Sequence, residues 1–98
     1  MTDTYILDGK MPVKATLTEW AQWFETSRDP RRVASTDKNG VRVSTVFLGV
    51  DYSYGDGPPP LFETMIFGGD HDGYEERCST WDEAEAMHKR ACSLAGIE

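Results

Sequence analysis

Two short motifs near the two ends of the chain divide it into helical and extended parts. Thr16 with Glu19, and Thr80 with Glu83, each have the S/T-x-x-E form of a capping box. In this motif the threonine and glutamate side chains satisfy free backbone amides at the start of a helix. The stretch between the two motifs is rich in β-branched and aromatic residues, which favour strands. Strands grouped between two helices indicate an α+β fold.

The first helix is expected to begin at Thr16 and to end near residue 27, because Pro30 disfavours helical geometry at the residue before it. Apolar residues recur at helical spacing along it, and they are Leu17, Trp20, Ala21 and Phe24. The second helix is expected to begin at Thr80 and to close at Gly96. Its predicted buried stripe consists of Ala84, Met87, His88, Ala91, Leu94 and Ala95.

Strands are predicted at residues 5–7, 32–36, 41–50, 61–67 and 74–78, and residues 11–13 are a possible continuation of the first one after an Asp-Gly turn. Asn39-Gly40 accepts positive φ at both central positions, as a tight hairpin turn requires. The charges in residues 74–78 are typical of an edge strand. The predicted order is β-α-β-β-β-β-α, with a mainly antiparallel sheet of four to five strands and two helices packed on one of its faces.

The 98 residues are the usual size of one domain, so a single domain over residues 1–98 is predicted. No apolar run reaches the roughly 20 residues that span a bilayer, so no membrane contact is expected. The first residues lack the basic start and apolar stretch of a signal peptide. We therefore expect a cytoplasmic protein whose two cysteines are reduced.

The formal net charge of −7 disfavours direct binding of nucleic acid, because phosphates are repelled by a negative field. One basic cluster consists of Arg28, Arg31 and Arg32. It follows the first helix, where cations interact favourably with the negative end of the helix dipole. A structural role therefore explains this cluster better than a phosphate site does.

Few residues offer the chemistry of an active site, and no catalytic residue or cofactor is predicted. Asp70, His71 and Asp72 could in principle approach a metal, but adjacent residues in a turn seldom converge on one ion. His88 and Cys92 lie one helical turn apart and form a second weak metal candidate. A buried histidine within the core is the better explanation of His88.

Two segments are better suited to binding. The Gly/Pro-rich loop of residues 52–60 carries Tyr52, Tyr54 and Asp56, and tyrosines on such loops are frequent in recognition surfaces. The second segment is an acidic hairpin, and its candidate contact residues are Asp70, Asp72, Glu75 and Glu76. Such carboxylates would attract a basic partner surface.

Residues 44–52 (STVFLGVDY), 57–69 (GPPPLFETMIFGG) and 77–88 (RCSTWDEAEAMH) form a specific pattern, to which residues 5–24 also contribute. This pattern resembles a family of small uncharacterised phage and prophage proteins. The resemblance covers nearly the whole chain and implies a phage-associated origin in the cytoplasm of a host cell. It assigns no catalytic role to any residue.

The leading hypothesis is a small acidic accessory protein that acts by protein–protein binding, for example by inhibiting a host defence complex as anti-CRISPR proteins do. The expected partner is a host or phage protein, for instance one with a basic nucleic-acid-binding surface. One alternative is a small metal-binding protein or hydrolase that uses His71, His88 and nearby carboxylates. Another is a structural or assembly protein that forms a homodimer, so both monomer and homodimer remain open.

Overall fold

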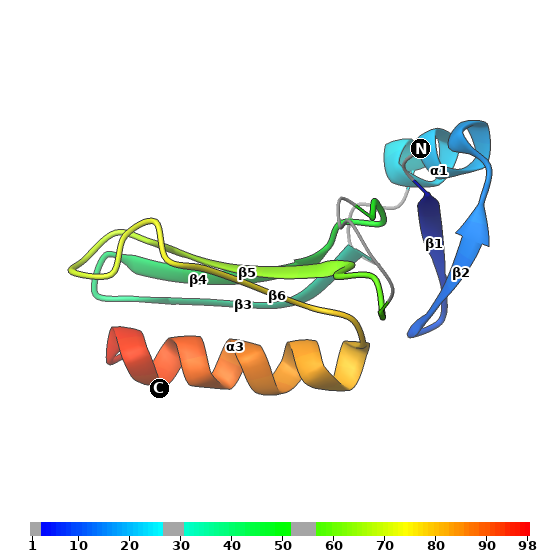
Figure 1. The fold of residues 1–98 in the computed structure, drawn as a ribbon. Coiled ribbons are helices and arrows are strands. Elements are labelled where there is room, and N and C mark those ends of the chain that lie inside the picture. Colours follow the sequence, from blue (N-terminus) through cyan, green and yellow to red (C-terminus); the bar gives the residue numbers. More distant parts are fainter. Residues whose placement is uncertain (1–2, 27–30, 52–56) are drawn as a thin grey trace.

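A computed structural model describes residues 3–26, 31–51 and 57–98 of the chain. Within these ranges the elements follow the order β-β-α-β-β-β-β-α (Figure 1). The elements are β1 (Thr4–Asp8), β2 (Met11–Ala15), α1 (Leu17–Thr26), β3 (Arg32–Lys38), β4 (Val41–Phe47), β5 (Phe62–Phe67), β6 (Glu75–Cys78) and α3 (Trp81–Ala95). The predicted α+β class with antiparallel strands is confirmed.

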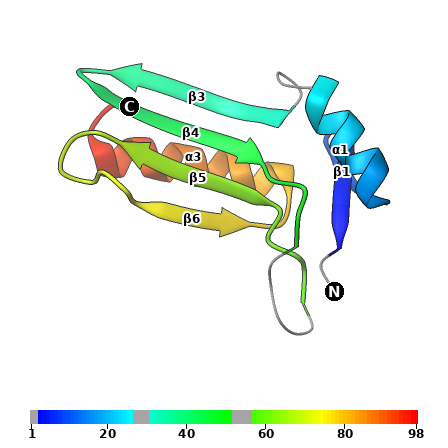
Figure 2. The same cartoon turned by 90° about the horizontal axis from the view of Figure 1, so that it is seen from above.

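Strands β3 to β6 form one antiparallel sheet in the order β3-β4-β5-β6, as seen from above in Figure 2. The predicted tight turn joins β3 to β4, with φ of 54° at Asn39 and 79° at Gly40. Strand β6 lies at one edge of the sheet, as its charges predicted. Strand β3 forms the other edge, and its register shifts between Arg32 and Ala34.

Helix α3 contacts all four strands of this sheet and covers one of its faces (Figure 1). Its start is the predicted capping box, because the Thr80 side chain accepts from the Glu83 amide and Glu83 accepts from the Thr80 amide. Gly96 ends the helix in the left-handed conformation, at φ 73°. The buried residues of the helix are Ala84, Met87, His88, Ala91 and Cys92. Leu94, which the spacing placed in this stripe, is 44% exposed.

The N-terminal part differs from the predicted arrangement. Gly9 adopts φ 63° and reverses the chain, so residues 11–15 pair back onto β1 as a second strand instead of continuing it. The strands therefore form two sheets, one of two strands and one of four. Helix α1 contacts β1 and β2 and lies beyond the end of the larger sheet, so α3 alone covers that sheet's face (Figures 1 and 2).

Helix α1 begins with the other predicted capping box. Thr16 N donates to Glu19 Oε1 at 2.8 Å, and Glu19 N donates to Thr16 Oγ1 at 3.1 Å. The hydrogen bonds from Thr16 hold the pKa of Glu19 below its ordinary value. The aromatic side of α1 contacts the larger sheet near the end of β4, where Trp23 meets Phe47 at 5.7 Å between ring centroids.

A short segment after β4 joins the two sheets. Tyr5 N donates to Gly49 O at 2.7 Å, Asp51 N donates to Asp3 O at 3.0 Å, and Val50 forms an isolated bridge with Thr4. Gly49 has φ 72°, and a Cβ there would lie 2.6 Å from Tyr5 O and 2.7 Å from Trp20 Nε1. The close approach of β1 and α1 to the larger sheet therefore requires glycine at this position.

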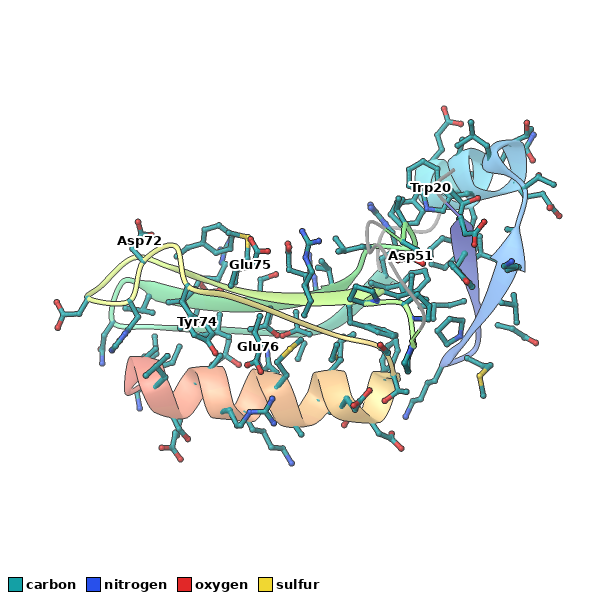
Figure 3. All side chains as sticks on the ribbon, viewed as in Figure 1. Trp20, Asp51, Asp72, Tyr74, Glu75 and Glu76 are labelled. Carbon is teal, nitrogen blue, oxygen red and sulfur yellow. The ribbon has the colours of Figure 1, made fainter. Side chains whose placement is uncertain are left out.

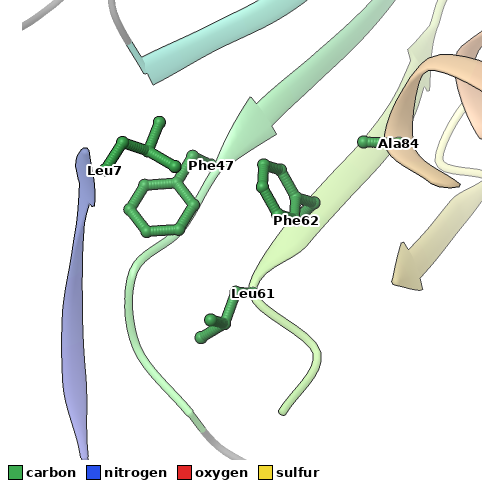
Figure 4. Packing of buried hydrophobic residues seen from close by; sticks show 5 residues of the cluster. All are labelled: Leu7, Phe47, Leu61, Phe62 and Ala84. Atoms are coloured by element: carbon green, nitrogen blue, oxygen red, sulfur yellow. The ribbon is translucent and has the colours of Figure 1, made fainter. Parts of the chain in front are cut away.

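The contact behind this junction is apolar. Figure 4 shows its buried cluster, which consists of Leu7 from β1, Phe47, Leu61 and Phe62 from the region of β4 and β5, and Ala84 from α3. Each of these side chains is less than a tenth exposed. The β1–β2 hairpin therefore caps one end of the layer between the larger sheet and α3.

Replacement of Gly49 by alanine is expected to lower the free energy of unfolding by more than about 2 kcal/mol, because the left-handed conformation costs a non-glycine residue and the new methyl group meets backbone and ring atoms. Urea denaturation followed by tryptophan fluorescence measures this change. Gly57→Ala is the control, since no atom of the described residues lies within 4 Å of a Cβ there. If Gly49→Ala lowered the free energy of unfolding no more than Gly57→Ala does, the junction would tolerate a side chain.

Candidate functional site

The larger sheet has a second face, on which no helix of the described residues lies (Figure 1). Side chains alternate between the two faces of a strand, and cross-strand partners share a face. Thr36, Thr45 and Thr64 belong to the face toward α3, because the first two bond His88 and the third bonds Thr45. The opposite side, here called the open face, carries Arg32, Ser35, Asp37, Arg42, Ser44, Val46, Glu63, Met65, Phe67, Glu75 and Arg77.

Ion pairs between neighbouring strands cross the open face. Arg42 Nε lies 2.8 Å from Asp37 Oδ1, and both side chains are more than half exposed. Arg77 lies 2.9 Å from Glu63 and 3.3 Å from Glu75. The pairs differ in exposure, because the exposed Asp37–Arg42 pair is worth about 0–1 kcal/mol, whereas Glu63 in the Arg77 pair is only 14% exposed. Their main effect is to leave the open face with a nearly balanced charge.

Phe67 is the exposed aromatic residue of the open face. It ends β5 opposite Arg42, and 47% of it is accessible to solvent. An open hollow of about 540 Å³ adjoins it, with walls formed by Asp37, Gly40, Val41, Arg42, Phe67 and Gly68. An exposed ring beside a hollow and surrounded by polar groups is a common feature of protein-binding surfaces.

The four acidic residues predicted to bind do not form one cluster. Asp70 and Asp72 lie in the exposed β5–β6 turn, where Asp72 Oδ1 accepts a hydrogen bond from Gly68 N at 2.7 Å. Glu75 lies on the open face, while Glu76 points toward α3 (Figure 3). Consecutive residues of a strand point to opposite faces, so the two glutamates are separated by the sheet.

Glu76 is held by two partners on the helix side. Arg90 Nη2 donates to one of its carboxylate oxygens at 3.1 Å, and Tyr74 Oη donates to the other at 3.0 Å. The hydrogen bond to Glu76 is the main reason that the pKa of Tyr74 is raised. Glu76 therefore serves to fix β6 against α3. The other predicted binding residues, Tyr52, Tyr54 and Asp56, lie outside the described residues.

His88 lies between the sheet and α3 and is 6% exposed. Its Nε2 is 2.9 Å from Thr36 Oγ1 and its Nδ1 is 2.8 Å from Thr45 Oγ1, while Thr45 also bonds Thr64. With both ring nitrogens in hydrogen bonds, the imidazole has no position left for a metal. The interpretation of His88 as a core residue is supported, and its partners are the hydroxyl groups of two threonines.

Other metal or nucleophile candidates are also separated from one another. In the part of the chain that the structure describes, no three His, Cys, Asp or Glu side chains come together as metal ligands would. His71 is exposed in the β5–β6 turn, whereas Cys92 is buried on α3. Burial, followed by the charge of Glu83, raises the pKa of the Cys78 thiol from 9.0 to about 11. A thiol with that pKa is a poor nucleophile near neutral pH.

Two residues of interest were not among the binding residues predicted from the sequence. The alternation in residues 61–67 placed Phe67 with Met65 and Glu63, but it did not indicate which face a helix would cover. Arg32 begins the predicted strand of residues 32–36, but its pairing with Val46 on the larger sheet could not be predicted from the strand alone. Neither residue has a local motif, because its setting depends on strand register.

Comparisons of the chain with protein-family models, with curated proteins and with solved structures found no match. Among the described residues, no helix combines the length and the apolar character that crossing a membrane requires.

The burial of His88 has a consequence for stability. Desolvation lowers its pKa in the folded protein below the ordinary value of 6.5. The neutral ring therefore stabilises the fold fully above about pH 6.5, and this contribution is lost as the pH falls through the folded-state pKa. We expect the free energy of unfolding to change less between about pH 7 and pH 5 in His88→Gln than in the wild type. His71→Gln, the same change at an exposed site, should keep the wild-type profile, and identical profiles for all three proteins would contradict the assignment.

The raised pKa of Cys78 predicts slow alkylation. At pH 8, iodoacetamide should modify Cys78 about a hundredfold more slowly in the folded protein than in urea, because a shift of two pKa units lowers the thiolate fraction by that factor. Mass spectrometry of the Cys78 peptide measures both rates. Equal rates in the two states would show that the thiol is not shielded.

Proposed function

We propose that this chain is a non-enzymatic accessory protein that binds a partner protein through the open face of its larger sheet. The observation that carries the proposal is Phe67, an aromatic side chain that is 47% exposed beside a hollow and next to the charged pair Asp37–Arg42. Binding energy at protein interfaces concentrates in such aromatic anchors, while the polar rim excludes water.

The charge of the chain favours a basic partner. The formal net charge is −7, and Asp70 and Asp72 lie exposed in the turn that begins directly after Phe67. A negative field speeds the approach of a positively charged surface and disfavours acidic competitors. A host or phage protein that itself binds nucleic acid has such a surface.

The resemblance to small phage proteins makes this proposal more specific. An acidic phage protein that covers the nucleic-acid-binding surface of a host defence complex would block that complex without any chemistry of its own, as anti-CRISPR proteins do. This version places the protein in the cytoplasm of the host cell. It requires that the captured partner lose its binding to DNA or RNA when this chain is added.

Affinity capture from a bacterial host lysate tests the proposal with two matched variants. Phe67→Ser removes the proposed anchor, and Leu17→Ser removes a side chain on α1 that is 68% exposed. Both positions are exposed, so neither change should unfold the protein. We expect one partner to be captured by the wild type and by Leu17→Ser, and its recovery to fall at least about tenfold with Phe67→Ser.

The charge contribution has its own pair of variants. Asp70→Lys should weaken capture at low salt, whereas Glu85→Lys, an exposed position on α3, should change it much less. A partner retained equally by Phe67→Ser and Leu17→Ser would rule out the open face as the binding surface. A gel-shift assay of the captured partner with its nucleic acid then tests the inhibitor version.

A further inference from the structure

A second site lies where α1, β3 and β4 meet, away from the Phe67 hollow. It is a cavity of about 220 Å³, and its walls are formed by Phe24, Arg31, Arg32, Val46, Phe47 and Leu48. Four of these six residues are apolar and two are arginines, and none is an acid. In a chain with 17 acidic and 10 basic residues, a cavity of this composition is unexpected.

The two arginines are set in different ways. The guanidinium carbon of Arg31 lies 4.5 Å from the centroid of the Phe24 ring, a cation–π contact that holds the group at the cavity wall. Arg32 begins β3 opposite Val46, just before the register shift of that strand. The shift allows Val33 to pack against the core while Arg32 and Val46 share the opposite side.

Arg32 also differs from the arginines elsewhere on the larger sheet and α3. Arg42, Arg77 and Arg90 each lie within 3.1 Å of a carboxylate oxygen. Within the described ranges 3–26, 31–51 and 57–98, no carboxylate forms an ion pair with Arg32. Its charge is therefore available to a ligand, next to apolar walls that strengthen an ion pair.

We propose that this cavity binds a small aromatic oxyanion, that is, one ring that bears a phosphate or a carboxylate. The guanidinium of Arg32 recognises the oxyanion, because its planar fork of N–H donors matches two oxygen atoms at once. The apolar walls and the guanidinium of Arg31 beside Phe24 receive the ring. The volume is below the roughly 300–1,000 Å³ of sites for drug-sized ligands, so the ligand has a single ring.

Titration of the ¹⁵N-labelled full chain with phenyl phosphate and with benzoate tests the site. At least one of the two should shift the amide signals of Phe24, Arg32 and residues 46–48 and should saturate, with Kd on the order of 10⁻⁴ to 10⁻³ M. Benzyl alcohol, which lacks the charge, and inorganic phosphate, which lacks the ring, should each bind at least about fivefold more weakly.

Two variants that each lose one positive charge distinguish a direct contact of Arg32 with the ligand from a general effect of the chain's net charge on binding. Arg32→Gln should weaken binding about tenfold, whereas Arg42→Gln, at the other end of the open face, should leave the affinity within about twofold. The amide spectrum of each variant reports whether it is folded. Equal loss in both variants, equal binding of benzyl alcohol or of inorganic phosphate, or the absence of saturation with both ligands would each overturn the proposal. None of these outcomes depends on the partner that the open face binds.

Discussion

The arrangement of this protein depends on the absence of a side chain at Gly49. The residue turns the chain at φ 72° directly after β4, and its carbonyl accepts the amide of Tyr5. Gly49 also lies against the indole of Trp20. A Cβ at Gly49 would therefore push both α1 and β1 away from the larger sheet. The cluster around Leu7 and Phe47 and the cavity beside Phe24 both form at this junction, and both therefore depend on the same backbone geometry.

The other half of the structure depends on a polar contact inside an apolar layer. His88 extends from α3 to Thr36 on β3 and Thr45 on β4, and Thr45 continues the network to Thr64 on β5. A buried imidazole without partners would cost free energy, so these hydroxyls define where the helix can lie on the sheet. Helix α3 is thereby fixed on that face, whereas no helix of the described residues lies on the opposite face of the same strands.

Local signals in the sequence predicted most of the elements. Both capping boxes, the Asn39-Gly40 turn and the edge strand β6 were predicted from short motifs whose physics is local. The partition into two sheets was not predicted, because it depends on how Gly9 reverses the chain and on which strands the returning segment meets. The placement of α1 depends on the same non-local contacts.

The candidate sites show a similar limit. Glu75 and Glu76 were grouped by their proximity in the sequence, yet the two-residue period of a strand sends them to opposite faces. Arg77 and Arg90 could not be recognised as their partners without the register of β6 and the position of α3.

The distribution of charge relates these observations to function. The eleven residues of the open face include three carboxylates and three arginines, whereas the whole chain carries a formal charge of −7. Most of the negative field therefore originates outside the proposed contact surface. Under the proposed function, a field of this kind would act on a basic partner before contact and would be screened by salt, while Phe67 and the balanced ion pairs would act after contact. Added salt should for that reason lower the association rate more than it raises the dissociation rate. The salt dependence of the two rates therefore distinguishes long-range attraction by the whole chain from the contacts of the open face.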